Sequence, residues 1–131
     1  KNGKIDALPL FPDTTMQLTA SLLMANPCDD EEDDMALLCC HGAKGEMFLM
    51  TRYPSDEELE VTLDDEPYLL RDLKVTVSPT RVRVEIAAAD AAAFNGDDLL
   101  EITHSTAPGD MEEVLQTLRN LLDGVGTLVV E

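Results

Sequence analysis

The chain has 131 residues, enough for one domain with its own core and short for two. Acidic residues number 27 against 9 basic ones, so the formal net charge is -18. Such an excess repels nucleic acid and anionic membranes, and it favours a basic partner attracted by the long-range field. High solubility or a salt-adapted proteome is the alternative interpretation of the same charge.

The first part of the chain predicts short strands interrupted by an acidic loop. Residues 1–13 contain prolines and a glycine and predict an irregular lead-in. Residues 14–26 alternate in part at strand spacing and favour a strand over a short helix. Residues 29–34 are six consecutive acids, whose repulsion predicts a solvated or partly disordered loop. Two apolar runs, 35–40 and 46–52, flank a glycine-bearing loop and predict a hairpin.

The middle of the chain carries the clearest strand pattern. Residues 59–63 alternate apolar and polar, which predicts a strand with one wet face, and residues 68–70 predict a short extended piece. Residues 73–77 and 82–86 alternate in the same way around Pro79, which predicts an antiparallel hairpin. The wet face of this hairpin carries three basic residues that can pair with acids across the strands: Lys74, Arg81 and Arg83.

The last part of the chain predicts two helices and two strands. Residues 87–94 are rich in alanine and predict a short helix, residues 99–103 predict a strand, and residues 127–130 can pair at a sheet edge. Residues 110–123 predict a long amphipathic helix, because apolar residues recur at intervals of three and four: Met111, Val114, Leu115, Leu118, Leu121 and Leu122. We expect Asp110 and Glu113 to form its capping box and Gly124 to end it.

These elements predict a single α+β domain over residues 1–131. We expect a mainly antiparallel sheet of about six strands, with the C-terminal amphipathic helix packed against it and the short Ala-rich helix beside it. The sequence shows no internal repeat or linker that would divide the chain.

Nothing in the sequence predicts catalysis, a cofactor or a metal site. His41 and His104 lie in predicted turns, without a nucleophile motif around either. Cys39 and Cys40 precede His41, but a structural zinc site needs a second, distant pair of ligands. Because neighbouring strand residues point to opposite faces, we expect one of these cysteines in the core and the other at the surface.

The cysteines and the hydropathy bear on the compartment. Cys28, Cys39 and Cys40 are an odd number and poorly placed to pair, which predicts free thiols and a reducing environment. The sequence has neither an apolar run of membrane-spanning length nor an opening signal peptide. We therefore expect a cytoplasmic protein.

The acids gather in two segments, residues 29–34 and 56–66, and these predict a binding surface for a basic partner. If the two segments emerge at the same edge of the sheet they form one negative patch; otherwise they are two separate solvated loops. The candidate partner-binding residues are Asp29, Asp30, Glu31, Glu32, Asp33, Asp34, Asp56, Glu57, Glu58, Asp64, Asp65 and Glu66.

From Phe48 to Gly124 the chain resembles a family of bacterial immunity proteins from polymorphic toxin systems, the tenth in that numbered series. The resemblance lies in the runs FLMTRYPSDEELEVTLDDEPYLL, DLKVTVSPTRVRVEIAAADAAAF, LLEITH and MEEVLQTLRNLLDG, in that order. PYLLR stands where the family has a stretch rich in glycine and aromatic residues. The resemblance implies a cytoplasmic protein that binds a cognate toxin domain and blocks it. Many such toxins attack nucleic acids and carry basic clefts.

Two other functions remain open at this point. The chain can be an acidic chaperone that dimerises and holds an unfolded segment of a secreted effector, although the predicted helix has a single apolar stripe, which favours a monomer. It can also be a DNA mimic, which requires carboxylates spaced like phosphates along a surface. All three interpretations describe a protein that binds another protein.

Overall fold

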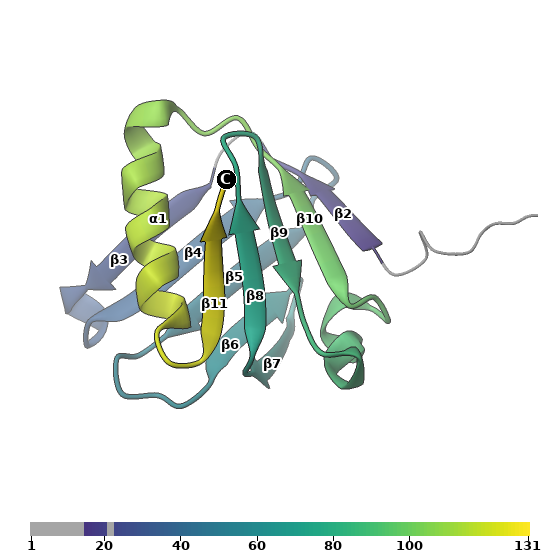
Figure 1. The fold of residues 1–131 in the computed structure, drawn as a ribbon, viewed down its shortest axis with the longest axis horizontal. Coiled ribbons are helices and arrows are strands. Elements are labelled where there is room, and N and C mark those ends of the chain that lie inside the picture. The colour runs from purple at the N-terminus through teal and green to yellow at the C-terminus, as the bar shows by residue number, and fades with distance from the viewer. Residues whose placement is uncertain (1–14, 21–22) are drawn as a thin grey trace, which may run out of the picture.

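A computed structural model describes residues 15–20 and 23–131 (Figure 1). These residues form two five-stranded sheets and one α-helix, α1 (Pro108–Leu122). The front sheet has the order β11-β8-β9-β10-β2, with β11 (Gly126–Val130), β8 (Leu73–Val77), β9 (Arg81–Glu85), β10 (Leu99–Thr103) and β2 (Thr15–Thr19). The back sheet has the order β3-β4-β5-β6-β7, with β3 (Met24–Asp29), β4 (Met35–His41), β5 (Met47–Arg52), β6 (Leu59–Leu63) and β7 (Glu66–Leu70).

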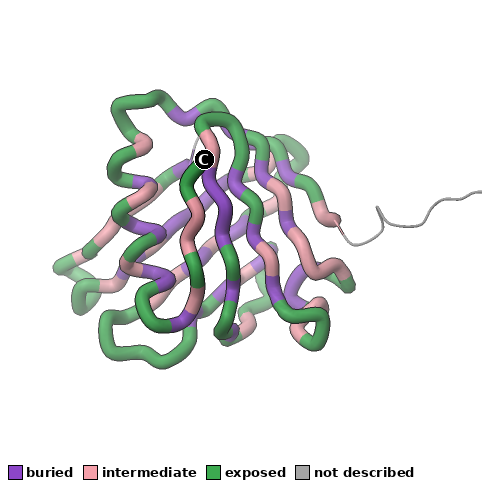
Figure 2. Tube along the Cα trace, in the orientation of Figure 1, coloured by how far each residue is buried: buried purple, intermediate pink, exposed green. Residues whose placement is uncertain are grey.

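The core lies between the two sheets. The front sheet and α1 lie on the same side of the back sheet, and α1 lies beside the edge strand β11 (Figure 1). Burial alternates along the strands, as expected for sheets with one face inside and one outside (Figure 2). Fully buried side chains come from both sheets and from α1, among them Leu38, Phe48, Met50, Val61, Val75, Val84, Leu100, Ile102 and Leu118.

The predicted fold class, α+β, is confirmed, but the predicted single sheet of about six strands is wrong. Each of the two sheets has one apolar face, and neither can bury that face alone, so the two pack together. Alternation in sequence indicates which face of a strand is buried. It does not indicate which sheet the strand joins.

The predicted strand over residues 14–26 is in fact two strands in different sheets. β2 pairs parallel with β10, whereas β3 pairs antiparallel with β4. A second parallel pair joins β11 to β8 at the edge of the front sheet, where the tail strand was predicted, and the other pairings are antiparallel. Thr14, like the predicted lead-in 1–13, lies outside the described residues.

Helix α1 begins earlier than predicted and is capped differently. Its first residue is Pro108, and the N-cap Ala107 makes no side-chain capping bond, so Asp110 lies inside the first turn and the predicted capping box is wrong. Proline suits the first helical position because it lacks the N–H that would have no partner there. The helix stops as predicted at Gly124, whose φ of 76° is strained for other residues.

The part of the chain that the structure describes also has two short 3-10 helices. The Ala-rich segment is a 3-10 helix, Ala88–Phe94, rather than an α-helix, and Asn95 ends it in the left-handed conformation. Its buried Phe94 packs near Phe48, with ring centroids 6.2 Å apart. The acidic run contains the other one, Asp30–Glu32, so the predicted solvated loop is a short turn between β3 and β4.

Candidate functional site

The structure brings nine of the predicted partner-binding acids to one end of the back sheet. Asp29 ends β3, the turn from β3 to β4 carries Asp30–Asp34, and the connection between β5 and β6 carries Asp56–Glu58. Ala36 at the start of β4 lies opposite Arg52 at the end of β5, so the two connections leave the sheet at the same end. The centres of the two connections are two strand spacings apart, which at about 4.8 Å for each spacing is about 10 Å. We call Asp29–Asp34 and Asp56–Glu58 the acidic end.

The remaining predicted acids lie elsewhere. Asp64 and Asp65 turn β6 into β7, and Glu66 begins β7, at the opposite end of the same sheet. Asp64 has a local role, because its side chain accepts a hydrogen bond from the backbone N–H of Met47 at 3.1 Å and its φ is 58°. The second acidic segment of the sequence, residues 56–66, is therefore divided between the two ends of the back sheet. The first, residues 29–34, lies at one end.

Local hydrogen bonds hold the acidic turn in shape. The Asp29 side chain accepts from the backbone N–H of Glu31 at 3.1 Å, and the backbone N–H of Asp34 donates to the Asp29 carbonyl at 2.9 Å. Asp33 and Asp34 are both left-handed, a conformation that aspartate tolerates better than most residues. The side chains from Asp30 to Asp34 are consequently exposed at the tip of a tight turn.

One thiol lies inside this negative field. Cys28 is exposed, and its Sγ lies 3.3 Å from a carboxylate oxygen of Asp34. The hydrogen bond to Asp34 favours the thiol over the thiolate and raises the pKa of Cys28 above its ordinary value, and the nearby charges add to this effect. Cys28 is therefore a poor nucleophile despite its exposure.

Arg52 connects the acidic end to helix α1. Its Nε and Nη2 donate to the backbone carbonyl of Asp56 at 3.0 and 2.7 Å. Its Nη1 donates to the carbonyls of Asn120, Leu121 and Asp123, where α1 ends. A cation is stabilised at a helix C-terminus, and these carbonyls have no partners within the helix. The guanidinium thus ties the 53–58 connection to α1 and borders a hollow of about 320 Å³ that Cys28 and Asp34 also line.

The outer face of the back sheet, which faces away from the front sheet, is partly apolar. Side chains in register across the sheet form the row Met24, Cys39, Leu49, Thr62 and Pro67, and the next row is Asn26, Leu37, Thr51, Glu60 and Leu69. Met24 is 41% exposed and Leu69 is 61% exposed. The sequence analysis missed this surface. The available signal was the run 35–40, which is apolar at every position, where a strand with a wet face would alternate.

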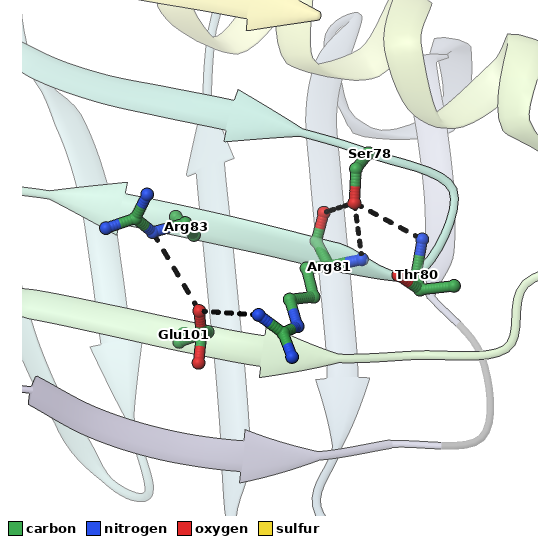
Figure 3. Close-up of polar contacts among 5 residues, drawn as sticks. All are labelled: Ser78, Thr80, Arg81, Arg83 and Glu101. Carbon is green, nitrogen blue, oxygen red and sulfur yellow. Dashed lines mark hydrogen bonds and ion pairs between the residues drawn. The ribbon is translucent and has the colours of Figure 1, made fainter. Parts of the chain in front are cut away.

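The outer face of the front sheet is polar. Arg81 and Arg83 on β9 both point toward Glu101 on β10, with nitrogen–oxygen distances of 3.7 and 3.9 Å (Figure 3). The pairing predicted for these two arginines is therefore confirmed, and Lys74 lies in register with Glu85. At the hairpin turn the Ser78 hydroxyl accepts from the backbone N–H of Arg81 at 3.0 Å (Figure 3).

The histidines and the paired cysteines lie apart from one another. His41 is exposed, whereas His104 is buried and its Nδ1 lies 3.0 Å from the Thr106 hydroxyl. Burial lowers the pKa of His104, and the nearby Ser78 carbonyl partly opposes that fall. Cys39 and Cys40 do point to opposite faces, but both are buried, so the predicted surface placement of one is wrong. Met24 and Leu49, opposite Cys39 on the neighbouring strands, leave its side chain little access to solvent.

The described residues contain no cluster of three or more His, Cys, Asp or Glu side chains placed to hold a metal ion. In residues 15–20 and 23–131, no helix has the length and apolar character needed to cross a membrane. Comparison of the chain with protein-family models, with curated proteins and with solved structures gave no significant match.

Proposed function

We propose that this chain is an immunity protein that binds and neutralises a cognate toxin domain with a basic cleft. The observation that carries the proposal is the acidic end, where two separate connections place their carboxylates at the same end of one sheet. The resemblance from Phe48 to Gly124 supports the same function independently of the charge.

The chemistry of such an inhibitor follows from its charge. A basic cleft that takes a phosphate backbone attracts carboxylates for the same electrostatic reason. The carboxylates at the tip of the β3–β4 turn are exposed, and Arg52 holds the neighbouring connection beside them. Seated in the cleft, they exclude the substrate of the toxin. They also speed association, because a field of this size steers the encounter of the two proteins.

The first experiment identifies the partner. The chain, immobilised at low salt, captures proteins from a lysate of its own organism, and a salt gradient elutes them for mass spectrometry. We expect one folded basic domain that binds at one to one and loses its activity when this chain is added. Recovery of an unfolded effector segment would support the chaperone instead, and a mixture of unrelated basic proteins would contradict specific binding.

The second experiment tests the acidic end with two charge-matched variants. One reverses Asp30, Glu31, Glu57 and Glu58 to lysine. The other reverses Asp110, Glu112, Glu113 and Glu131, which are exposed away from the acidic end. Both change the net charge equally, so a difference between them reports position. We expect the first to slow association at least about tenfold at low salt and to flatten its salt dependence. Equal on-rates for the two variants would contradict a role for the acidic end.

A further inference from the structure

The outer face of the back sheet carries apolar side chains that nothing in the fold requires there. Leu37, Cys39 and Leu49 lie at its centre, on the two neighbouring strands β4 and β5. Met24 on β3 and Met47 on β5 lie beside them and are 41% and 37% exposed. Leu69 on β7 is 61% exposed and lies beyond Thr62 and Glu60 of β6. Both α1 and the front sheet lie on the other side of this sheet (Figure 1). The outer face of the front sheet instead carries Arg81, Arg83 and Glu101 (Figure 3).

The edges of the back sheet discourage a partner from adding a strand. Pro67 lies in the edge strand β7 and Pro27 in the edge strand β3, where the register also shifts between Asn26 and Asp29. Proline has no N–H to donate to a new strand, and a bulge twists an edge away from pairing. A partner of this sheet therefore binds its face rather than its edge.

The charges around the face indicate the chemistry of its occupant. The acidic end borders the outer face at one end of its strands, and Asp64, Asp65 and Glu66 border it at the opposite end. A second copy of this chain would bring like charges together at both borders. A protein surface with an apolar centre and lysines or arginines on both flanks meets the apolar side chains and both acidic borders at once.

We infer that the outer face of the back sheet docks a basic, amphipathic surface of a folded partner, with Leu37 and Leu49 at the centre of the contact. The inference rests on the proposed function and extends the contact from the acidic end to the whole face. Five strands at about 4.8 Å and several residues at about 3.4 Å each give a face of roughly 20 by 20 Å. The face alone, about 400 Å², is about half of the roughly 800 Å² that one side of a standard interface buries, and the acidic borders enlarge it at both ends.

Two synthetic peptides serve as probes of this surface. One is a helical peptide with leucines on one face and lysines on both flanks, and the other replaces each leucine by serine at the same charge. The test variant is Leu37→Thr with Leu49→Thr, which removes apolar surface from the outer face and keeps strand-forming residues. Leu99→Thr, on the outer face of the front sheet, is the matched control. Thermal unfolding of each variant verifies that it is folded.

We expect the leucine peptide to bind at least about tenfold more tightly than the serine peptide, because only it buries apolar surface. Its binding shifts the backbone NMR signals of β4 and β5. The test variant loses this tenfold advantage and the Leu99→Thr control keeps it.

Three results would overturn the inference. They are equal affinity of the two peptides, signal shifts centred on the groove of about 380 Å³ between α1 and β11, and self-association at high salt that the test variant abolishes. The serine peptide separates this inference from the proposed function. If it binds the acidic end in a salt-dependent way while the leucine advantage is absent, the proposed function stands and only the docking surface fails. If it does not bind the acidic end, the electrostatic basis of the proposed function fails as well.

Discussion

Replacing Arg52 by methionine tests how the acidic end is held to the rest of the fold. The substitution keeps an unbranched apolar stem and removes the guanidinium that links Asp56 to the last carbonyls of α1. A hydrogen bond to a charged group contributes about 1.5–3 kcal/mol, and a cation at a helix C-terminus about 0.3–1 kcal/mol. Because Arg52 is only partly buried, water can replace it at several of these carbonyls. We therefore expect a loss of about 2 kcal/mol in the free energy of unfolding.

Thermal and urea unfolding followed by circular dichroism measure this loss. For a domain of this size, about 2 kcal/mol corresponds to a fall in Tm of roughly 7 °C. Arg52→Lys restores the charge at the end of α1 but not the forked contact with Asp56, so its stability lies between those of Arg52→Met and the unchanged chain. Arg71→Met, at an exposed arginine between β7 and β8, is the control and stays within about 0.5 kcal/mol. A loss for Arg52→Met no larger than that of the control would refute the reasoning.

Three further predictions follow from single side chains. Asp34→Asn removes the charge and weakens the hydrogen bond that raise the pKa of Cys28, so iodoacetamide alkylates Cys28 faster, and an unchanged rate would contradict the role of Asp34. Cys40, whose burial raises its pKa to about 12, stays unreactive in the folded chain. Burial lowers the pKa of His104 below its ordinary 6.5, so the unfolded chain binds a proton first as the pH falls. The stability that His104 contributes is complete above pH 6.5, the ordinary pKa, and is lost as the pH falls from there through the lower pKa of the folded chain. Urea unfolding at about pH 7.5 and 5.5 measures this loss, which is smaller for His104→Gln. Leu118→Ala empties part of the core under α1, where Leu118 is fully buried, and costs about 2–5 kcal/mol by urea unfolding, whereas a cost below about 1 kcal/mol would mean that α1 does not pack there.

The placement of the acids shows where inference from sequence ended. Six consecutive acids predict a solvated or partly disordered loop, because their charges repel one another and attract water, and residues 30–34 form an exposed turn. Whether that turn meets another acidic segment depends on the direction and order of the strands. Antiparallel pairing of β4 with β5 brings Asp56 to the same end as Asp29, and one more strand carries Asp64 to the opposite end.

The sequence by itself determined the local structure wherever one short range of residues decides it. Alternation of buried and exposed side chains indicated the strands β8 and β9 and their inward faces, and Gly124 ended α1 because glycine accepts a positive φ. The predicted start of α1 at Asp110 was wrong because a proline at the first helical position, Pro108, is a competing start signal.

Only the tertiary structure decided what depends on residues far apart in the chain. It divided ten strands between two sheets, placed β2 against β10 and β11 against β8, and buried Cys39 on an outer face. The physical reason is that a strand pattern states which side chains avoid water but not which distant side chains cover them. That choice is made by the joint burial of two apolar faces, and it also left the leucines of the back sheet facing outward, beside the acids.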